Sequence, residues 1–266
     1  MLRAIRVDRL RRWARSPKGL FTGILALLTL LAAPQAGWQR VGPLLLVAMG
    51  SAALLDAPLN RQRDKRWTFP DGGLLTGWLI GMILSPHESL LAAAGASVLG
   101  IGAKHLLRVG RANVLNPAAA GLVASALLLQ TGQSWWGALP DQSLPAFAVL
   151  LGTTTFMAWR LGKVPLLLAF LLTHFTLATG SAWFGEPRQV AELFRSPDLQ
   201  MAVFFAGFMA TDPPTSPPRH RDQLGYAIIA ALGGWLVFRW TGSVVFLLAG
   251  LLAANLWEGE RKRRRG

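Results

Sequence analysis

Residues 1–33 read MLRAIRVDRLRRWARSPKGLFTGILALLTLLAA, a basic segment followed directly by an apolar run. Residues 1–18 include seven Lys and Arg residues, whereas residues 20–33 include no charged residue. Basic residues that flank a membrane helix favour the cytoplasmic side. A cleaved signal peptide begins in the same way, but Pro34 stands where its cleavage site prefers a small residue. We therefore expect an uncleaved first transmembrane helix with a cytoplasmic N-terminus.

The composition of the whole chain fits the same class of protein. Of its 266 residues, 52% are hydrophobic and 15% are charged, whereas soluble domains have about 25% charged residues. The net charge of +14 does not indicate a nucleic-acid partner, because the basic residues lie between apolar runs and form no continuous face. The absence of cysteine excludes disulfides, thiolate zinc sites and cysteine-ligated iron–sulfur clusters within the chain.

Ten apolar windows follow one another along the chain. A transmembrane helix needs about 20 residues, and two windows are shorter and end in loops that include proline. The sequence therefore predicts an all-α polytopic membrane protein with about ten transmembrane helices, two of them short and broken. The windows are 19–35, 42–59, 72–85, 89–107, 112–130, 144–159, 163–183, 200–212, 223–239 and 241–257.

The distribution of basic residues predicts the orientation. With ten helices, 23 of the 27 Lys and Arg residues fall on the side of the N-terminus, as the positive-inside rule requires. We expect a single integral membrane domain, 1–266, in the bacterial inner membrane, with cytoplasmic basic tails at 1–18 and 258–266. Tryptophans near the ends of the windows predict an aromatic belt at the membrane interfaces; they are Trp38, Trp67, Trp135, Trp136, Trp159, Trp183, Trp240 and Trp257.

The two short windows predict an internal repeat. GLLTGWLIGMILSP (73–86) and MAVFFAGFMATDPPTSP (201–217) both mix small with bulky apolar residues and end in a proline loop. Five windows in each half would invert repeat two (136–257) relative to repeat one (19–135), and such repeats place binding sites between them. Two unrelated short helices are the alternative. Gly77, Gly81 and the glycines of 95–102 predict close helix packing.

Two polar clusters interrupt apolar stretches, where polar groups usually have a function. Asn113 and Asn116 would share one face of a helix; alternatively, Asn116 caps a helix that begins at Pro117. A helix cap and a ligand site are compatible roles for Asn116, because a helix N-terminus attracts anions and polar carbonyls. In the second cluster, Thr211, Asp212 and Thr215 precede or lie among prolines, and a rigid turn with a solvated Asp212 is the alternative.

Other polar residues give no catalytic assignment. His174 is the only histidine deep in a window, and a single histidine there is typical of hydrogen-bonded packing rather than of a ligand. The sequence shows no pairing of a nucleophile with a base and no cluster of metal ligands, so we predict neither catalytic residues nor a metal site.

Three stretches resemble the RnfD/NqrB family, membrane subunits of the Rnf and Na⁺-pumping NADH:quinone electron-transport complexes. DGGLLTGWLIGMILSP (71–86) is similar to the family's first short helix. AKHLLRVGRANVLNPAAAGL (103–122) is similar to its Gly-Lys-His and Asn-Pro-x-x-x-Gly stretch, with Ala103 in place of the glycine. FMATDPPTSP (208–217) is similar to its Ala-Thr-Asp-x-x-Thr-(Ser/Ala)-Pro motif.

The resemblance implies a subunit of a flavin-dependent, ion-translocating electron-transport complex, which is not an oxidoreductase or translocase by itself. Its partners would be other membrane subunits and flavoproteins, not nucleic acid. Family members attach FMN to a Thr in a Ser-Gly-x-Thr motif, but the matching residues here, Ser196 to Leu199, lack that Thr. We therefore expect noncovalent FMN or riboflavin and no covalent FMN. A solute or ion channel on the same scaffold and a non-redox scaffold for flavoproteins are the alternatives.

The two clusters and the resemblance together predict one binding site. We expect Asn116 and the pair Thr211–Asp212 to approach one another across the two halves and to flank a cavity, with basic residues close enough to balance Asp212 or a flavin phosphate. The predicted cofactor-binding residues are Lys104, Arg108, Asn113, Asn116, Pro117, Thr211, Asp212 and Thr215.

Overall fold

The computed structural model describes residues 13–110, 112–140, 142–183, 191 and 194–265. This part of the chain folds into ten α-helices, each on one of the ten apolar windows, so the prediction of an all-α protein is confirmed. The helices are α2 (Pro17–Ala36), α3 (Trp38–Asp64), α4 (Asp71–Ile83), α5 (Leu90–Leu106), α6 (Pro117–Leu128), α7 (Leu144–Arg160), α8 (Val164–Trp183), α10 (Asp198–Phe205), α11 (His220–Thr241) and α12 (Phe246–Arg265).

Short irregular elements connect some of these helices. A 3₁₀ turn, η1 (Trp136–Ala138), lies between α6 and α7, and a π-helical turn, η2 (Ala206–Ala210), extends α10. The strands β1 (Arg108–Val109) and β2 (Ala112–Asn113) form an antiparallel hairpin in which Arg108 is opposite Asn113.

One of the predicted boundaries is wrong. The window 112–130 is helical only from Pro117 to Leu128, because residues 112–113 pair as a strand and Asn116 caps the helix. The last helix, α12, continues through the predicted basic tail as far as Arg265. Pairs between Glu260 and both Arg263 and Arg264, three and four residues apart, support that last turn.

Four of the described helices are long and apolar enough to cross a membrane, judged by length and composition: Pro17–Ala36, Trp38–Asp64, Val164–Ser181 and His220–Thr241. The apolar helices α4, α5, α6 and the segment Asp198–Ala210 are shorter. Large apolar side chains on several helices face outward; Leu54 in α3 is 79% exposed and Leu172 in α8 is 72% exposed. Exposed apolar surface of this kind marks a surface that binds lipid or protein.

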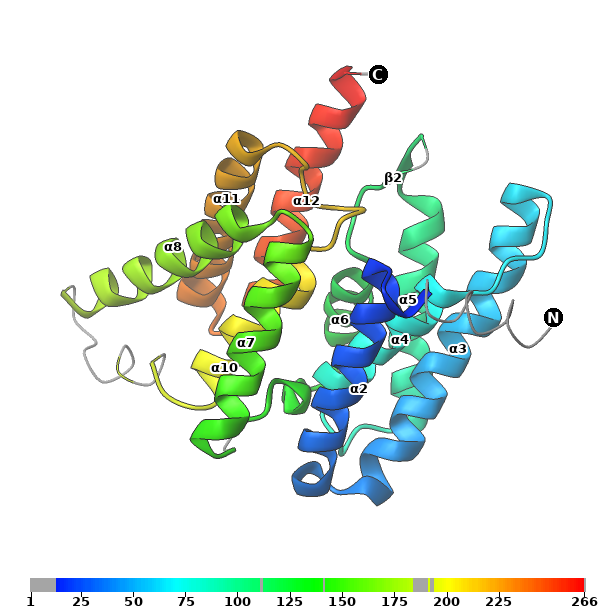
Figure 1. Cartoon of the computed structure of the whole chain (residues 1–266), viewed down its shortest axis with the longest axis horizontal. Coiled ribbons are helices and arrows are strands. Elements are labelled where there is room, and N and C mark those ends of the chain that lie inside the picture. The colour runs from blue at the N-terminus through cyan, green and yellow to red at the C-terminus, as the bar shows by residue number, and fades with distance from the viewer. Residues whose placement is uncertain (1–12, 111, 141, 184–190, 192–193, 266) are drawn as a thin grey trace.

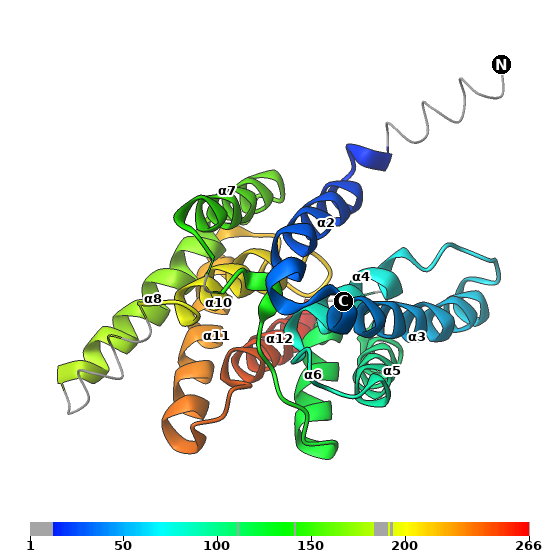
Figure 2. The ribbon, with the colours of Figure 1, turned by 90° about the horizontal axis from the view of Figure 1, so that it is seen from below.

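The helices form two groups that lie side by side, α2 to α6 and α7 to α12, as the views in Figures 1 and 2 both show. In the first group α3 packs against α4 and α5, and α5 packs against α6. In the second group α8 packs against η2 and α11, and α11 packs against α12. The order of contacts in the first group, α4 with α3, α3 with α5 and α5 with α6, is the same as that of η2 with α8, α8 with α11 and α11 with α12 in the second. Contacts of α2 with α7 and of α6 with α12 join the groups.

Glycines allow the closest helix contacts, as the sequence predicts. A Cβ atom on Gly77 would lie 2.4 Å from the carbonyl oxygen of Ala48, so α4 and α3 touch through their backbones there. Gly100 in α5 lies equally close to α6, and Gly250 in α12 lies close to Ala230 in α11. These contacts position α4, α5 and α6, which border the cavity described below.

Of the tryptophans in the predicted aromatic belt, some are exposed at helix ends and two are not. Trp183 and Trp240 are 86% and 81% exposed at helix ends. Trp135 and Trp136, in contrast, are each 4% exposed, because η1 lies between the two groups of helices. The indole N–H of Trp136 donates to the carbonyl oxygen of Gly81 over 2.8 Å. These two side chains are part of the core rather than anchors at an interface.

Candidate functional site

A cavity of about 960 Å³ lies where the two groups of helices meet, and its volume is typical of a small-molecule or cofactor site. The first residues of α2, α4 and α6 border it, together with residues from the C-terminal parts of α3, α5 and α7, from η2 and from the loop after η2. Seven of the eight predicted site residues line this cavity, namely Lys104, Arg108, Asn113, Asn116, Pro117, Thr211 and Asp212. The eighth, Thr215, contacts Asp212.

Asn116 links the two groups of helices. Its side-chain oxygen accepts from the N–H of Ala119 over 3.0 Å and so caps α6, with Pro117 as the first helical residue. Its own N–H donates to Oδ1 of Asn255 over 2.7 Å, and its Nδ2 donates to the carbonyl oxygen of Met209 over 3.5 Å. The cap is thus confirmed, and the same residue borders the cavity.

The structure supports only part of the prediction for Asn113. Asn113 lines the cavity with Asn116. It lies in β2, however, so the two asparagines do not share a helix face. The hairpin turns at Gly110, whose φ of +59° is a left-handed conformation that favours glycine. This turn brings Asn113 opposite Arg108, another lining residue.

The segment 211–216 is tied together by its own side chains. Thr211 Oγ1 donates to the carbonyl oxygen of Gly207 over 2.5 Å, and Thr215 Oγ1 donates to Oδ2 of Asp212 over 2.9 Å. Ser216 donates from both its N–H and its hydroxyl to the carbonyl oxygen of Asp212. The segment is thus the rigid turn of the predicted alternative, and Asp212 is partly exposed at the cavity wall.

Burial shifts the pKa of two groups, Asp212 in this segment and Lys163 directly before α8. Burial raises the pKa of Asp212 to about 6, although the Thr215 hydroxyl and the charges of Lys163, Lys262 and Lys104 act in the opposite direction. Burial lowers the pKa of Lys163 to about 8. The ammonium group of Lys163 donates to the carbonyl oxygens of Ser216 and Pro217, and so holds the loop after Asp212.

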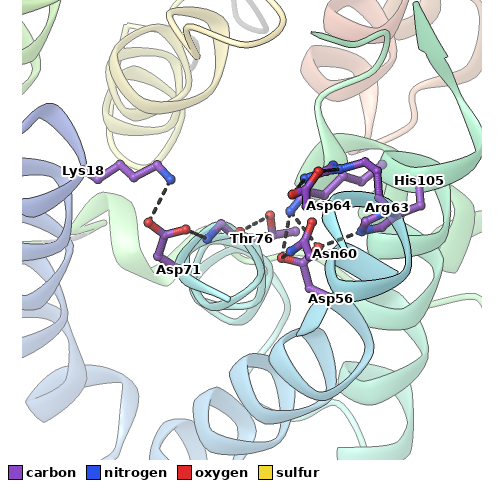
Figure 3. Close-up of polar contacts among 10 residues, drawn as sticks. Lys18, Asp56, Asn60, Arg63, Asp64, Asp71, Thr76 and His105 are labelled. Carbon is purple, nitrogen blue, oxygen red and sulfur yellow. Dashed lines mark hydrogen bonds and ion pairs between the residues drawn. The ribbon is translucent and has the colours of Figure 1, made fainter. Parts of the chain in front are cut away.

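A buried carboxylate on the cavity wall was not among the predicted site residues. Asp56 in α3 is 0% exposed. Its oxygens accept from Lys104 Nζ over 2.7 and 2.9 Å and from Asn60 Nδ2 over 2.9 Å, and His105 Nε2 lies 2.8 Å away. Figure 3 shows Asn60 and His105 converging on Asp56. The sequence does contain a signal for this site: Asp56 is an acidic residue inside an apolar window, and Asn60 follows it by one helical turn.

Other charged pairs stand around the start of α4. Lys18, in the first turn of α2, contacts Asp71 over 2.8 Å, and Figure 3 shows this pair on the opposite side of the helix from the Asp56 cluster. Arg63 contacts both oxygens of Asp64 over 2.8 and 2.7 Å. Ion-paired cations thus border the cavity on both sides of α4.

Another part of the cavity is apolar. Phe21 and Phe208, from the two different groups of helices, have ring centroids 5.9 Å apart. The remaining apolar side chains of this part are Leu75, Leu79, Met157 and Leu161. The cavity therefore combines an apolar region with amide and hydroxyl groups and with ion pairs. Such a lining can hold a small molecule that has both an apolar part and polar groups.

Two further predicted features lie away from the cavity. Residues 196–199 are at the beginning of α10, whereas η2 at the other end of that segment borders the cavity. Leu199 has no hydroxyl group and packs against the core. His174 stacks on Phe170 with centroids 5.6 Å apart and lies near Phe246, which agrees with a packing role.

No protein-family model matches the chain, and no curated protein is significantly similar to it.

Proposed function

We propose that this chain is a multi-pass membrane subunit of a flavin-dependent electron-transport complex, similar to RnfD and NqrB, and that it binds flavin noncovalently. The observation that supports this most is that both family-like motifs, Asn116 with Pro117 and Thr211 with Asp212, line the same cavity. These motifs are far apart in the sequence, and neither could form such a site alone.

The residues of the cavity suit the parts of a flavin. The apolar region around Phe21 and Phe208 would hold the ring system, and the side chains of Asn113, Asn116 and Thr211 would meet its polar edge. A bound flavin would supply one- and two-electron transfer. The chain itself would orient the ring and keep water from it. Ion translocation, as the resemblance implies, would depend on the partner subunits.

The positions of the cavity residues support the proposed orientation in a membrane. If successive helices cross in alternate directions, the starts of α2, α4 and α6 and the ends of α3, α5, α7 and η2 all lie on one side. These are the ends that border the cavity, and they are on the side with 23 of the 27 basic residues. The site would then face the bacterial cytoplasm. Inverted repeats would explain why α2 meets α7 and α6 meets α12.

An absorbance spectrum of the detergent-purified chain tests the proposal. We expect flavin absorbance that passes into the supernatant after acid precipitation, because Leu199 provides no hydroxyl for a phosphoester. A tryptic peptide across residues 196–219 should have its unmodified mass. Flavin that stays in the pellet would contradict noncovalent binding. If the preparation has no flavin and takes up none, the electron-transport function is wrong.

A carrier for an anionic solute is the second candidate function. The observation in its favour is that lysine and arginine side chains, Lys18, Lys104 and Arg108 among them, line the cavity. Such side chains are common contacts of small anions. Reconstitution into liposomes separates the two functions. A carrier would move a labelled anion such as phosphate across the bilayer without flavin, whereas the proposed subunit would not.

A further inference from the structure

The loop after η2 cannot be held in place by its own backbone alone. Four of the six residues 213–218 are prolines, which have no N–H to donate. The N–H groups of the other two, Thr215 and Ser216, both donate to the carbonyl oxygen of Asp212. Backbone carbonyl groups inside a protein are almost always paired. The remaining carbonyl groups of this loop therefore depend on donors from other elements.

Lys163 supplies two of these hydrogen bonds from inside the protein. The residue lies directly before α8 and is 4% exposed. Its ammonium group donates to the carbonyl oxygen of Pro217 over 2.5 Å and to that of Ser216 over 3.4 Å. The negative charge of Asp212, in the same loop, favours the protonated form of this lysine. Lys163 thus fixes the second half of the loop.

Two helices supply further donors. Lys262, near the end of α12, donates to the carbonyl oxygen of Pro214 over 3.0 Å. Gln223 in α11 donates to the carbonyl oxygens of Pro218 over 3.3 Å and of Gly162 over 3.0 Å. The loop is therefore attached to α12, to α11 and to the start of α8. None of the three donor side chains is among the residues that line the cavity.

The first half of the same loop is part of the cavity wall. Thr211, Asp212, Pro213 and Pro214 line the cavity, and Pro214 is also the residue that accepts from Lys262. A wall that is in place before the ligand arrives loses less conformational freedom on binding, and this raises the affinity. The affinity of the cavity should therefore depend on donors that lie outside it.

We infer that Lys163 and Lys262 are positioning residues for the ligand of this cavity, because they hold the loop whose residues 211–214 form part of its wall. This inference rests on the proposed flavin site. It adds to that site two residues that determine its affinity from outside the cavity.

Methionine variants of the two lysines test the inference by titration of the purified full-length chain with FMN, followed by flavin fluorescence. We expect about tenfold weaker binding for Lys163→Met and about threefold weaker binding for Lys262→Met, because the loop loses two hydrogen bonds in the first variant and one in the second. Lys262→Arg keeps the donors and should bind within about twofold of the unaltered chain. Arg264→Met is the matched control, because its side chain is 77% exposed, and it should leave the affinity unchanged.

Trypsin provides a measurement that needs no flavin. Arg219 is exposed and directly follows the loop, and cleavage of a folded chain depends on local opening. Without flavin, cleavage after Arg219 should be about tenfold faster in Lys163→Met than in the unaltered chain.

A variant that is destabilised elsewhere separates positioning from a general loss of stability. Leu44→Ala removes buried side-chain volume in the half of α3 that does not border the cavity. It should lower the melting temperature and leave the FMN affinity and the cleavage after Arg219 within about twofold of the unaltered chain. Equal weakening of FMN binding by Leu44→Ala and Lys163→Met at similar melting temperatures would overturn the inference.

The inference and the proposed function fail in different ways. Unchanged FMN binding by both lysine variants, or unchanged cleavage after Arg219 in Lys163→Met, would overturn the inference and leave the proposed flavin site intact. If Lys163→Met does not fold, the comparison of Lys262→Met with Lys262→Arg and Arg264→Met decides, and equal affinities of these three variants would overturn the inference. If the unaltered chain binds no FMN, the proposed function is wrong and the inference with it.

Discussion

The backbone N–H of Asn116 donates to Oδ1 of Asn255 over 2.7 Å, although the two residues are 139 positions apart. Both residues are buried. The side-chain nitrogen of Asn255 donates in turn to the hydroxyl oxygen of Tyr226. The start of α6 is therefore fixed to α12 and α11, and this contact holds together the two groups of helices that border the cavity.

Replacement of Asn255 by Ala should destabilise the protein. It leaves the buried N–H of Asn116 without its acceptor, and an unpaired buried donor costs about 1–3 kcal/mol. Unfolding by SDS in mixed micelles measures the loss. Leu256→Ala alters a 58% exposed neighbour on the same helix and should change the free energy of unfolding by at most about 0.5 kcal/mol. Equal effects of both variants would mean that the hydrogen bond is unimportant.

Two glycine variants test the contact between α3 and α4. Gly77→Ala should lower the melting temperature, because its Cβ would lie 2.4 Å from the carbonyl oxygen of Ala48 and would push the helices apart. Gly50→Ala is the matched control in α3, where a Cβ would meet nothing within 4 Å. It should stabilise the helix slightly, by up to about 1 kcal/mol. A neutral Gly77→Ala would contradict the close approach.

The Asp56 cluster predicts strong coupling between two residues. Asp56→Asn leaves Lys104 without its carboxylate, and loss of one member of a buried pair costs about 3–5 kcal/mol. We expect a value near the lower limit, because the lysine keeps 13% side-chain exposure. The double variant Asp56→Asn, Lys104→Met should recover part of this loss. Additive losses in the double-mutant cycle would show that the pair is not coupled.

The pH dependence of stability tests the burial of Asp212. Its folded-state pKa is raised from 3.8 to about 6, so the folded state holds the proton more tightly than the unfolded state. The destabilisation by the ionised carboxylate is therefore full above about pH 6 and is relieved as the pH falls towards 4.

The variant Asp212→Asn has no carboxylate to protonate, so its stability does not gain from this protonation as the pH falls. Between pH 7.5 and pH 5, the melting temperature of the unaltered protein should rise relative to that of the variant by about 2–4 °C, as for about 1 kcal/mol. This value is below what the full pKa shift implies, because water in the cavity screens the charge. Parallel curves for the two proteins would show that Asp212 does not titrate in this range.

The sequence predicts the helices well and the contacts between distant helices less well. Long apolar runs separated by basic loops are local signals, so each of the ten windows indicates its helix. The proline after Asn116 and those after Asp212 mark the broken segments at the cavity. The partner of Lys104, in contrast, is Asp56 on another helix, and only the packing of α3 against α5 brings them together.

Local sequence also misleads at two places. Asn113 stands at the start of an apolar window, yet the turn at Gly110 makes it part of a hairpin. Trp135 and Trp136 have the spacing of interface anchors, but η1 inserts between the two groups of helices and buries both. Gly110 is a local signal for the hairpin, whereas the burial of the two tryptophans has no signal within its own stretch of sequence.

The most direct test of the central claim is the amount of flavin bound when the cavity is filled by a side chain. Leu161 lines the cavity, and Leu161→Trp would occupy part of its apolar region. Leu168→Trp makes the same change at a 60% exposed position of α8. After incubation with FMN and gel filtration, the unaltered chain and Leu168→Trp should retain about one flavin per chain, and Leu161→Trp should retain little. Equal retention by all three proteins, or none by the unaltered chain, would contradict a flavin site in this cavity.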